Sequence, residues 1–451
     1  MDLRLLLLLF ALLPACGKAP PLPPPTHPVV LIGVDGLEWS VMRPLLESGR
    51  LPNLARLAER GVAGKLQTLR PTLSPAIWTS VVTGVRPERH GIRSFITEKG
   101  VPLNSSARAG RALWNIASMF GRKTLSVGWW MTWPAEEIDG WMVAPYSSAG
   151  QTDMNWKGNL RRDLPDQTWP RDLINEVYPF VERLLEARSF REIDQPFFGD
   201  VDLSLLDEQE RRLVAETRWS VSADAAFAGI TRHLLEKPEV KPDLTLVYLG
   251  GPDVASHRFW RYQNPDLFHY PIDGRAIAAL SEIIHRFYEA ADRMVGQILA
   301  AAPQDANVIV CSDHGFTAYA TDARDPTGVS AHHLDGPPGV IFLAGPDIRA
   351  GGVQDLVLGR VLEIAPLVLY LLEIPLARDL DIPDGGSLLR QTVREGVLAG
   401  RPPRPEVATH NTGFRPPVAP STVSETMNDD ILEWMRQLGY TAAKTHGDPP
   451  K

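Results

Sequence analysis

The amino-acid sequence predicts an α/β fold with a parallel-rich central sheet and helices on both of its faces. Three runs rich in Val, Ile and Leu are typical of strands buried on both sides, namely residues 29–34, 244–249 and 307–312. Segments with apolar residues at helical spacing accompany them, including 51–58, which Gly61 ends, and 276–301. Alternating strands and helices are the pattern of parallel α/β domains.

The remaining elements follow from the same patterns. We expect helices at 41–46 and 364–372, a terminal helix at 426–438, and strands at 124–127, 140–143 and 339–344. Residues 147–225 differ because they are polar and aromatic, with helical stretches at 172–187 and 207–218 and no strong strand. We interpret them as a helical and irregular insertion that caps the core, a kind of segment in which substrate choice commonly resides.

The size and charge of the chain narrow the class of protein. Its 451 residues, 44% of them hydrophobic, suffice for a large core, either in one α/β domain or in a domain with an insertion. The formal net charge is −8 and no basic stripe is visible, so we expect no nucleic-acid partner. The composition does not indicate an oligomeric state.

The N-terminus has the features of an export signal. Arg4 precedes the apolar stretch Leu5–Leu13, which is too short to span a membrane comfortably. The following Leu13-Pro14-Ala15-Cys16-Gly17 resembles a bacterial lipobox, in which cleavage before the cysteine leaves Cys16 as the lipid-bearing first residue. The alternative is an ordinary signal peptide with an incidental cysteine. We predict a protein exported to the bacterial cell envelope and anchored to a membrane by its N-terminal lipid.

These features divide the chain into four parts. Residues 1–15 form the signal peptide, and residues 16–28 form a Pro-rich tether that should be extended and semi-rigid. Residues 29–400 form the main domain, and residues 401–451 contain a second Pro-rich stretch and the terminal helix.

Polar side chains follow each of the three long strands at its carboxyl end. Asp35 follows the first, Asp253 and His257 follow the second, and Asp313 and His314 follow the third. Ligands of open α/β sheets bind outside the carboxyl ends of the strands, so we expect these side chains at one edge. Asp and His suit zinc-like divalent ions, and one ion does not need so many ligands. The sequence therefore predicts a two-metal hydrolytic site.

Several motifs in order carry a family resemblance. They are VDG at 34–36, PTLSPAIWTSVVTG at 71–84 continuing to PERHGI at 87–92, PDxxxH at 252–257, SDHG at 312–315, and a late histidine before GVIFLAGP and IAPLVLYLL. With them the chain resembles the alkaline phosphatase superfamily, specifically its type I phosphodiesterase/nucleotide pyrophosphatase branch. The resemblance implies an alkaline-phosphatase-like sandwich fold.

The resemblance also implies a nucleophile. In that family a Ser or Thr at the start of a helix attacks phosphorus, and the motif places Ser74 there, with Thr72 as the second candidate. Pro75 suits the first turn of a helix, where its missing N–H is not needed. The positive end of the helix dipole favours an alkoxide and an anionic substrate. The structural alternative, a helix cap formed by Ser74, is compatible with this role.

The metal ligands carry over in the same way. Asp35, Asp313 and His314, together with Ser74, resemble one metal site, and Asp253, His257 and the late histidine resemble the other. Two histidines are candidates for the late ligand. His332 lies four residues before Gly336, as in the usual HxxxG spacing, and is preferred, while His333 remains open. The implied cofactors are two divalent ions, zinc first and manganese second.

The substrate-binding residues are less clearly marked. Nucleotide pyrophosphatases have an asparagine shortly after HGI that helps to hold the phosphoryl oxygen, and that position falls at Phe95 here. The backbone near Ser74, Arg93 or the insertion are candidates to replace it. Trp130, in the aromatic cluster 129–134, is a candidate for stacking on the substrate, and a packed core corner is an equally supported interpretation.

These residues predict a hydrolase that cleaves phosphodiester or pyrophosphate bonds through a seryl-phosphate intermediate. Its substrate would be a phosphorylated small molecule, lipid or glycan. The alternatives are a phosphomonoesterase, a sulfatase, a phosphotransferase, or a surface lipoprotein that binds phosphoryl ligands without turnover. A sulfatase is disfavoured because Ser74-Pro75-Ala76-Ile77-Trp78 lacks the proline spacing and the arginine of the C/S-x-P-x-R context.

Overall fold

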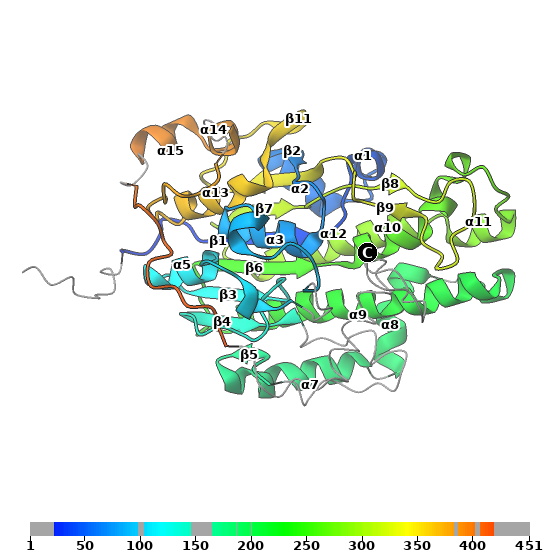
Figure 1. Ribbon diagram of the computed structural model, residues 1–451, viewed down its shortest axis with the longest axis horizontal. Coiled ribbons are helices and arrows are strands. Elements are labelled where there is room, and N and C mark those ends of the chain that lie inside the picture. The colour runs from blue at the N-terminus through cyan, green and yellow to red at the C-terminus, as the bar shows by residue number, and fades with distance from the viewer. Residues whose placement is uncertain are drawn as a thin grey trace, which may run out of the picture.

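The computed structural model describes residues 22–97, 103–145, 165–185, 187–199, 201–382, 387–401 and 406–418. Within these residues, strands form a nine-stranded sheet in the order β11-β2-β10-β7-β1-β6-β3-β4-β5 (Figure 1). The strands are β1 (Val29–Val34), β2 (Val62–Gln67), β3 (Thr124–Val127), β4 (Gly140–Val143), β5 (Thr168–Trp169), β6 (Leu244–Leu249), β7 (Asn307–Cys311), β10 (Gly339–Ala344) and β11 (Gly352–Arg360). A second, two-stranded sheet pairs β8 (Thr317–Ala318) with β9 (Ala331–His332).

The centre of the large sheet is parallel, as predicted. β1 pairs in parallel with both β6 and β7, and β3 pairs in parallel with β6 and β4. Antiparallel pairs lie farther out, between β10 and its neighbours β7 and β2 and between β4 and β5. The three strands that precede Asp35, Asp253 and Asp313 are therefore adjacent and run in the same direction.

Helices cover both faces of the sheet, again as predicted. Along β1, Val30, Ile32 and Val34 pack into one hydrophobic core, and Val29 and Leu31 pack into the other. The first core includes α1 (Trp39–Glu47), α2 (Pro52–Arg60), α9 (Glu208–Leu235), α10 (Gly251–Gln263) and α12 (Ile283–Ala301). The second includes α3 (Ser74–Thr83), α5 (Leu113–Met119), α13 (Ile364–Leu371) and α14 (Ser387–Thr392).

The other α-helices among the described residues are α4 (Pro87–His90), α7 (Ile174–Leu185), α8 (Ala187–Phe198), α11 (Gly274–Leu280) and α15 (Glu395–Gly400). Of these, α7, α8 and α11 also contribute buried residues to the first core. Both α7 and α8 pack against α9 (Figure 1). No helix in the described parts of the chain is both long enough and apolar enough to cross a membrane.

The region interpreted as an insertion is joined closely to the core. Its last helix, α9, begins after Asp207, whose side chain accepts from the backbone of Glu210 while the Glu210 side chain accepts from Asp207. The helix continues without interruption past residue 225 to Leu235, and Phe227 and Ile230 are buried in the core. The boundary at 225 thus falls inside a core helix.

Some predicted elements differ in detail. The helix predicted at 276–301 is two helices, α11 and α12, which are separated at Ser281 and Glu282. The strands β2 and β11 were not predicted. The signal peptide, Cys16 and the terminal helix at 426–438 lie outside the described residues.

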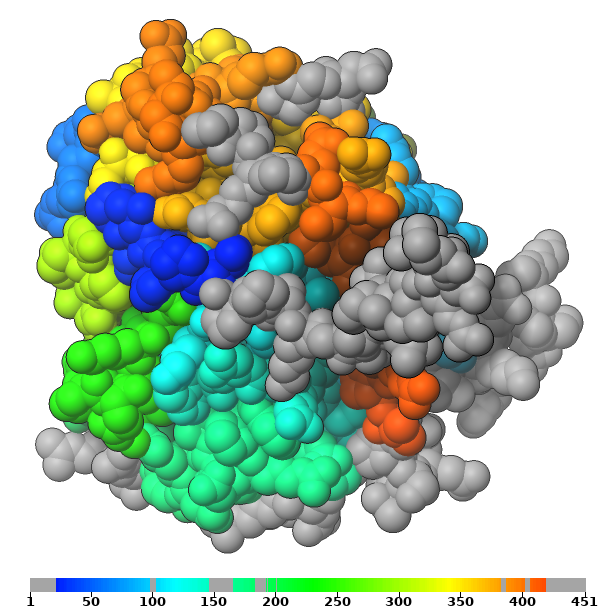
Figure 2. All heavy atoms as spheres, turned by 90° about the vertical axis from the view of Figure 1, so that its left-hand side faces the viewer, coloured from blue at the N-terminus to red at the C-terminus, as the bar shows by residue number. Residues whose placement is uncertain are grey.

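The described end of the tether lies against the domain. The backbone N–H of Leu22 donates to the carbonyl of Phe120, and the hydroxyl and N–H of Thr26 donate to Glu373. Figure 2 shows this segment, in dark blue, at the surface of the molecule.

Candidate active site

Three carboxylates meet beyond the carboxyl ends of β7, β1 and β6. Asp313, Asp35 and Asp253 are each at most 3% exposed. The turn after β1 allows this close approach because Gly36 has φ +72° and a Cβ there would lie 2.8 Å from the Cα of Asp253. The glycine of the VDG motif thus brings the β1 loop against the start of α10.

The first group consists of Asp35, Asp313 and His314. All three are buried, and their candidate ligand atoms lie within 4.8 Å of one another. The Nε2 atom of His314 is 3.3 Å from Oδ1 of Asp35 and 3.3 Å from Oδ2 of Asp313. The structure therefore brings together the three residues predicted for one metal site.

The second group consists of Asp253, His257 and His333. Asp253 and His257 lie one turn apart on α10, and their Oδ1 and Nε2 atoms are 3.6 Å apart. The Nε2 of His333 is 4.0 Å from the same oxygen. The Nδ1 atoms of His257 and His333 each lie 2.8 Å from a backbone carbonyl, of Ala331 and Thr72 respectively. Because a carbonyl only accepts, each Nδ1 carries the proton, and each Nε2 is left with a lone pair on the side of Asp253.

The histidine that lies in this group is His333, whereas the HxxxG spacing favours His332. His332 lies in β9, opposite Thr317, and its ring packs on Tyr319 with 5.4 Å between ring centroids. Successive side chains along an extended chain point to opposite sides, so only one of the two imidazoles can face Asp253. The HxxxG spacing gives no information about which of the two side chains faces Asp253.

The two groups form one centre. Oδ1 of Asp253 lies 4.0 Å from Nε2 of His314, in addition to its contacts with His257 and His333. The rings of His314 and His333 are stacked, with centroids 3.8 Å apart. Three carboxylates and three imidazoles thus share one buried volume.

Ser74 lies at the edge of this centre. It is the first residue of α3, it is fully buried, and its Oγ is 3.5 Å from Nε2 of His314. The cap position of α3 belongs to Leu73, and no side-chain cap bond is formed. Thr72 is placed differently, because its hydroxyl donates to the backbone carbonyl of His333. The geometry favours Ser74 over Thr72 as the nucleophile.

Burial sets the protonation of these groups. It lowers the pKa of His257 to about 4 and of His314 to about 3, and it lowers the pKa of His333 well below the usual value. The three imidazoles are therefore neutral at pH 7, the form that binds metals. Burial, followed by the charge of Asp253, raises the pKa of Asp35 to about 7, and burial, followed by the charge of Asp35, raises the pKa of Asp313 well above its usual value.

The residues fit a pair of divalent cations. Among the described residues, Oδ1 of Asp35 and both carboxylate oxygens of Asp313 are buried and have no hydrogen-bond partner. Buried carboxylates without donors are costly, and a cation would satisfy them. The donor set of carboxylate oxygens and imidazole nitrogens is one that zinc accepts.

Two hydrogen-bond donors to Asp35 were not predicted from the sequence. The indole Nε1 of Trp78 and the hydroxyl of Tyr248 donate to Oδ2 of Asp35 at 2.8 and 2.6 Å. They leave Oδ1 directed toward His314. The helical spacing of four residues between Ser74 and Trp78 was the available signal, since it places both on one side of α3.

A further network joins the loops of the first group. The carboxylate of Glu38 accepts from the backbone N–H of Phe316 at 2.6 Å, and the N–H of Leu37 donates to the Ser312 hydroxyl at 2.9 Å. The loop after β1 is thereby tied to the loop after β7. Glu38 is buried, and burial raises its pKa.

The predicted substrate-binding residues lie in different settings. Arg93 is exposed at the surface. Trp130 is 9% exposed and packs edge-on against Phe95 and Tyr248, with ring centroids 5.7 and 5.9 Å apart. Trp130 and Phe95 belong to the second core, and Tyr248 packs against it.

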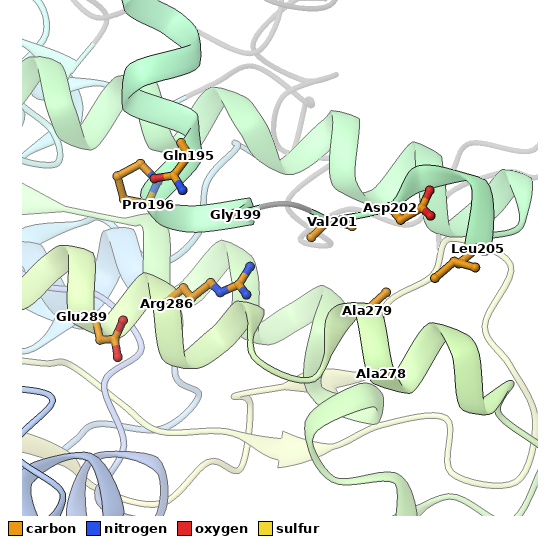
Figure 3. Close-up of a pocket in the computed structure, with 10 residues that line it drawn as sticks. All are labelled: Gln195, Pro196, Gly199, Val201, Asp202, Leu205, Ala278, Ala279, Arg286 and Glu289. Atoms are coloured by element: carbon orange, nitrogen blue, oxygen red, sulfur yellow. The ribbon is translucent and has the colours of Figure 1, made fainter.

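A cavity of about 560 Å³ lies away from this centre. Figure 3 shows Arg286 reaching toward the end of α8, where its Nη1 donates to the carbonyl of Phe198 at 2.7 Å. The lining residues are Gln195, Pro196, Gly199, Val201, Asp202, Leu205, Ala278, Ala279, Arg286 and Glu289. None of them belongs to either group of the centre.

The family match places the chain among the hydrolases of the alkaline phosphatase superfamily. Residues 29–335, which are most of the chain, match the family described as type I phosphodiesterase/nucleotide pyrophosphatase. The chain belongs to that family. Members are generally metal-dependent, in keeping with the clusters of candidate ligands.

Solved structures with a similar fold have low sequence identity. Human ectonucleotide pyrophosphatase/phosphodiesterase 5 is 13% identical, with a TM-score of 0.47 over 81% of this chain and 100% of that chain. An inactive variant of the murine protein in complex with AMP is 11% identical, with a TM-score of 0.46 over 81% and 100%. A protein assigned as a sulfatase from Bacteroides thetaiotaomicron is 12% identical, with a TM-score of 0.49 over 82% and 75%. No curated protein matches the chain.

Proposed function

We propose that this protein hydrolyses phosphodiester or pyrophosphate bonds, with Ser74 as the nucleophile beside a two-metal centre. The observation that carries the proposal is the placement of Oγ of Ser74 at 3.5 Å from His314, where two buried groups of three candidate ligands adjoin. A nucleophile and six ligands converge there from distant parts of the chain. Membership of the phosphodiesterase family favours phosphoryl over sulfuryl substrates.

Each group would hold one ion, most suitably zinc. Asp35, Asp313 and His314 would bind the ion next to Ser74, and Asp253, His257 and His333 would bind the other. When bound, such ions lower the pKa of an attacking hydroxyl and neutralise charge on the phosphoryl group.

The side chains then account for the reaction. Oγ of Ser74 loses its proton and attacks phosphorus, the bond from phosphorus to the leaving oxygen breaks, that oxygen takes up a proton, and the phosphoryl group is bound to Ser74. Water attacks the same phosphorus in a second step, which releases the product and restores the Ser74 hydroxyl. The N-terminus of α3 supplies a positive dipole at the point where negative charge collects.

The test compares turnover of bis-p-nitrophenyl phosphate and p-nitrophenyl phosphate by the full-length protein in detergent, with zinc or manganese. We expect diester hydrolysis that a chelator abolishes and that Ser74→Ala reduces to background. Thr72→Val should keep most of the activity, and the exposed Ser48→Ala is a matched control, since its hydroxyl bonds only within α1 and its turn.

Other outcomes would redirect the proposal. A preference for the monoester would keep the nucleophile and change the function to that of a phosphatase. Absence of turnover of both compounds by protein that holds two metal ions would contradict the proposal and favour a sulfatase, a transferase or a binding protein. Loss of activity in Thr72→Val but not in Ser74→Ala would assign the role of nucleophile to Thr72 instead of Ser74.

We also propose that the protein is exported and lipid-anchored through Cys16. The support is the apolar stretch Leu5–Leu13 followed by Leu13-Pro14-Ala15-Cys16-Gly17. Mass spectrometry of the mature N-terminus in a bacterial host should find a lipid on Cys16 and no residues before it. An unmodified Cys16, or cleavage elsewhere, would rule out the anchor.

A further inference from the structure

A buried aspartate contacts the start of the helix that carries Asp253 and His257 of the second group. Asp224 lies in the middle of α9, on a turn facing the sheet, and is 3% exposed. A carboxylate in such a position is costly unless hydrogen bonds satisfy it. Its Oδ1 accepts from the backbone N–H of Gly250 and its Oδ2 from that of Gly251, both at 2.8 Å.

These two N–H groups belong to the start of α10. The N-cap of α10 is Gly250, which has no side chain, and no side-chain cap bond is formed within the helix itself. The first N–H groups of any helix have no partner inside it, and Ser, Thr, Asp or Asn usually caps them. Asp224 performs this task from another helix, and its negative charge lies at the positive end of the α10 dipole.

The contact requires glycine at position 251. A Cβ there would lie 2.7 Å from Oδ2 of Asp224, closer than any side chain could be accommodated without a shift. The Gly-Gly pair before the PDxxxH motif thus allows α9 to approach the first turn of α10.

We propose that Asp224 is a positioning residue for the second metal group. Asp253 follows Gly251 by two residues in the first turn of α10, and His257 lies one turn farther on. The position of both side chains relative to His333 therefore depends on where α10 begins. The first group has orienting contacts of its own, because Trp78 and Tyr248 donate to Asp35 and neither lies on α9 or α10.

This assignment rests on the proposed two-metal function and gives the region before residue 225 a part in the centre. Asp224 could affect both the stability of the fold and the affinity of the second metal group, and a stability measurement alone would not distinguish these two effects. A merely structural aspartate would change the free energy of unfolding only. A positioning residue also weakens one of two metal ions selectively, by roughly tenfold to a hundredfold, as residues that orient metal ligands do.

The structure supplies a matched control. Asp292, on α12, is likewise buried and accepts from the backbone N–H groups of Leu54 and Asn53 at the start of α2, at 2.8 and 3.2 Å. It caps a second helix from a distance, as Asp224 does. Neither α2 nor α12 contributes a residue to the two metal groups.

The experiment measures zinc by elemental analysis and by competition with a chromogenic chelator, in the full-length wild type, Asp224→Asn and Asp292→Asn. We expect two equivalents in the wild type and in Asp292→Asn, and one tight equivalent in Asp224→Asn. Gly251→Ala is the second variant, because its Cβ displaces the same contact without removing the carboxylate; it should match Asp224→Asn.

Two results would overturn the inference. One is unchanged zinc affinity in both Asp224→Asn and Gly251→Ala, with a loss of stability equal to that of Asp292→Asn. The other is a wild type that binds fewer than two equivalents, since a second metal group would then not exist. Failure of the proposed function gives a different result, namely two bound equivalents in the wild type and no turnover of phosphoesters.

Discussion

Removing the Tyr248 hydroxyl should weaken metal binding at the first group. Tyr248 is the penultimate residue of β6 and is half-buried, and its hydroxyl donates to Oδ2 of Asp35 at 2.6 Å. Tyr248→Phe deletes this bond and retains the ring, which contacts Trp78 and Trp130 edge-on. The Trp78 indole bond to the same oxygen remains.

The magnitude follows from the charge of the acceptor. A hydrogen bond to a charged group contributes about 1.5–3 kcal/mol, and about 1.4 kcal/mol corresponds to a factor of ten in a dissociation constant. Without the bond Asp35 is less well oriented, and its pKa rises because the Tyr248 bond lowers it. We therefore expect zinc to bind the first group about tenfold to a hundredfold more weakly.

The assay is a zinc competition titration with a chromogenic chelator, together with turnover of the diester at limiting and at excess zinc. Activity of Tyr248→Phe should fall at limiting zinc and recover at excess zinc. Tyr370→Phe is the control, because its hydroxyl donates to the carbonyl of Arg401, in a different part of the molecule. Equal zinc affinity in Tyr248→Phe and wild type would refute the role of Asp35 as a ligand oriented by Tyr248.

Three further predictions concern other residues. His333→Ala should lower the zinc content from two equivalents to one while His332→Ala keeps both, as measured by elemental analysis after dialysis; the reverse pattern would return the ligand role to His332. Burial lowers the pKa of His90 from 6.5 to about 4, so the stability that this neutral imidazole provides is present above pH 6.5 and is lost as the pH falls. Urea unfolding should show wild type losing about 2 kcal/mol more than His90→Asn between pH 7 and pH 5, and equal losses would mean that His90 is not held neutral. Arg108→Met leaves Glu136 buried without its cation partner at 2.8 Å and should cost about 3–5 kcal/mol of unfolding free energy, whereas a cost below about 1 kcal/mol would contradict the assignment of a buried ion pair.

The sheet and its reactive edge could be predicted because they depend on local patterns. The strands β1, β6 and β7 are largely apolar runs, and an aspartate lies within four residues of the end of each. Parallel neighbours must present those ends at the same edge. The meeting of Asp35, Asp253 and Asp313 therefore followed from the sequence once the three runs were identified.

The two strands at one end of the sheet, β11 at its edge and β2 beside it, could not be predicted in this way. β2 is VAGKLQ, with two small residues and a lysine, and its partner β11 leaves Val353, Leu356 and Val357 at least 40% exposed. Neither has the continuous or alternating apolar pattern of a buried strand. β2 pairs with both β10 and β11, and β11 pairs with β2, so pairing rather than local composition makes them strands.

Which of two neighbouring residues faces the centre could not be predicted either, because it depends on contacts between distant parts of the chain. Whether His332 or His333 faces Asp253 depends on how β9 pairs with β8, and the two strands are separated by a loop of 12 residues or so in which no periodicity is visible. Tyr248 and Trp78 donate to Asp35 across 213 and 43 residues of sequence. Asp224 lies in a segment that composition had separated from the core. Such partners have no local signature because their function is to contact residues from other elements.

The arrangement of the centre also explains why its carboxylates and imidazoles must be considered together. Burial raises the pKa of Asp35 from 3.8 to about 7, so the metal-free fold loses stability as the pH rises from 3.8 through 7 and the proton leaves. Burial lowers the pKa of His257 and His314, so the metal-free fold also loses stability as the pH falls below 6.5. Bound cations would offset the first cost by compensating the carboxylates and would use the neutral imidazoles as ligands. The same burial that makes the empty centre unfavourable therefore gives it a strong preference for divalent ions, and folding and metal binding should be coupled.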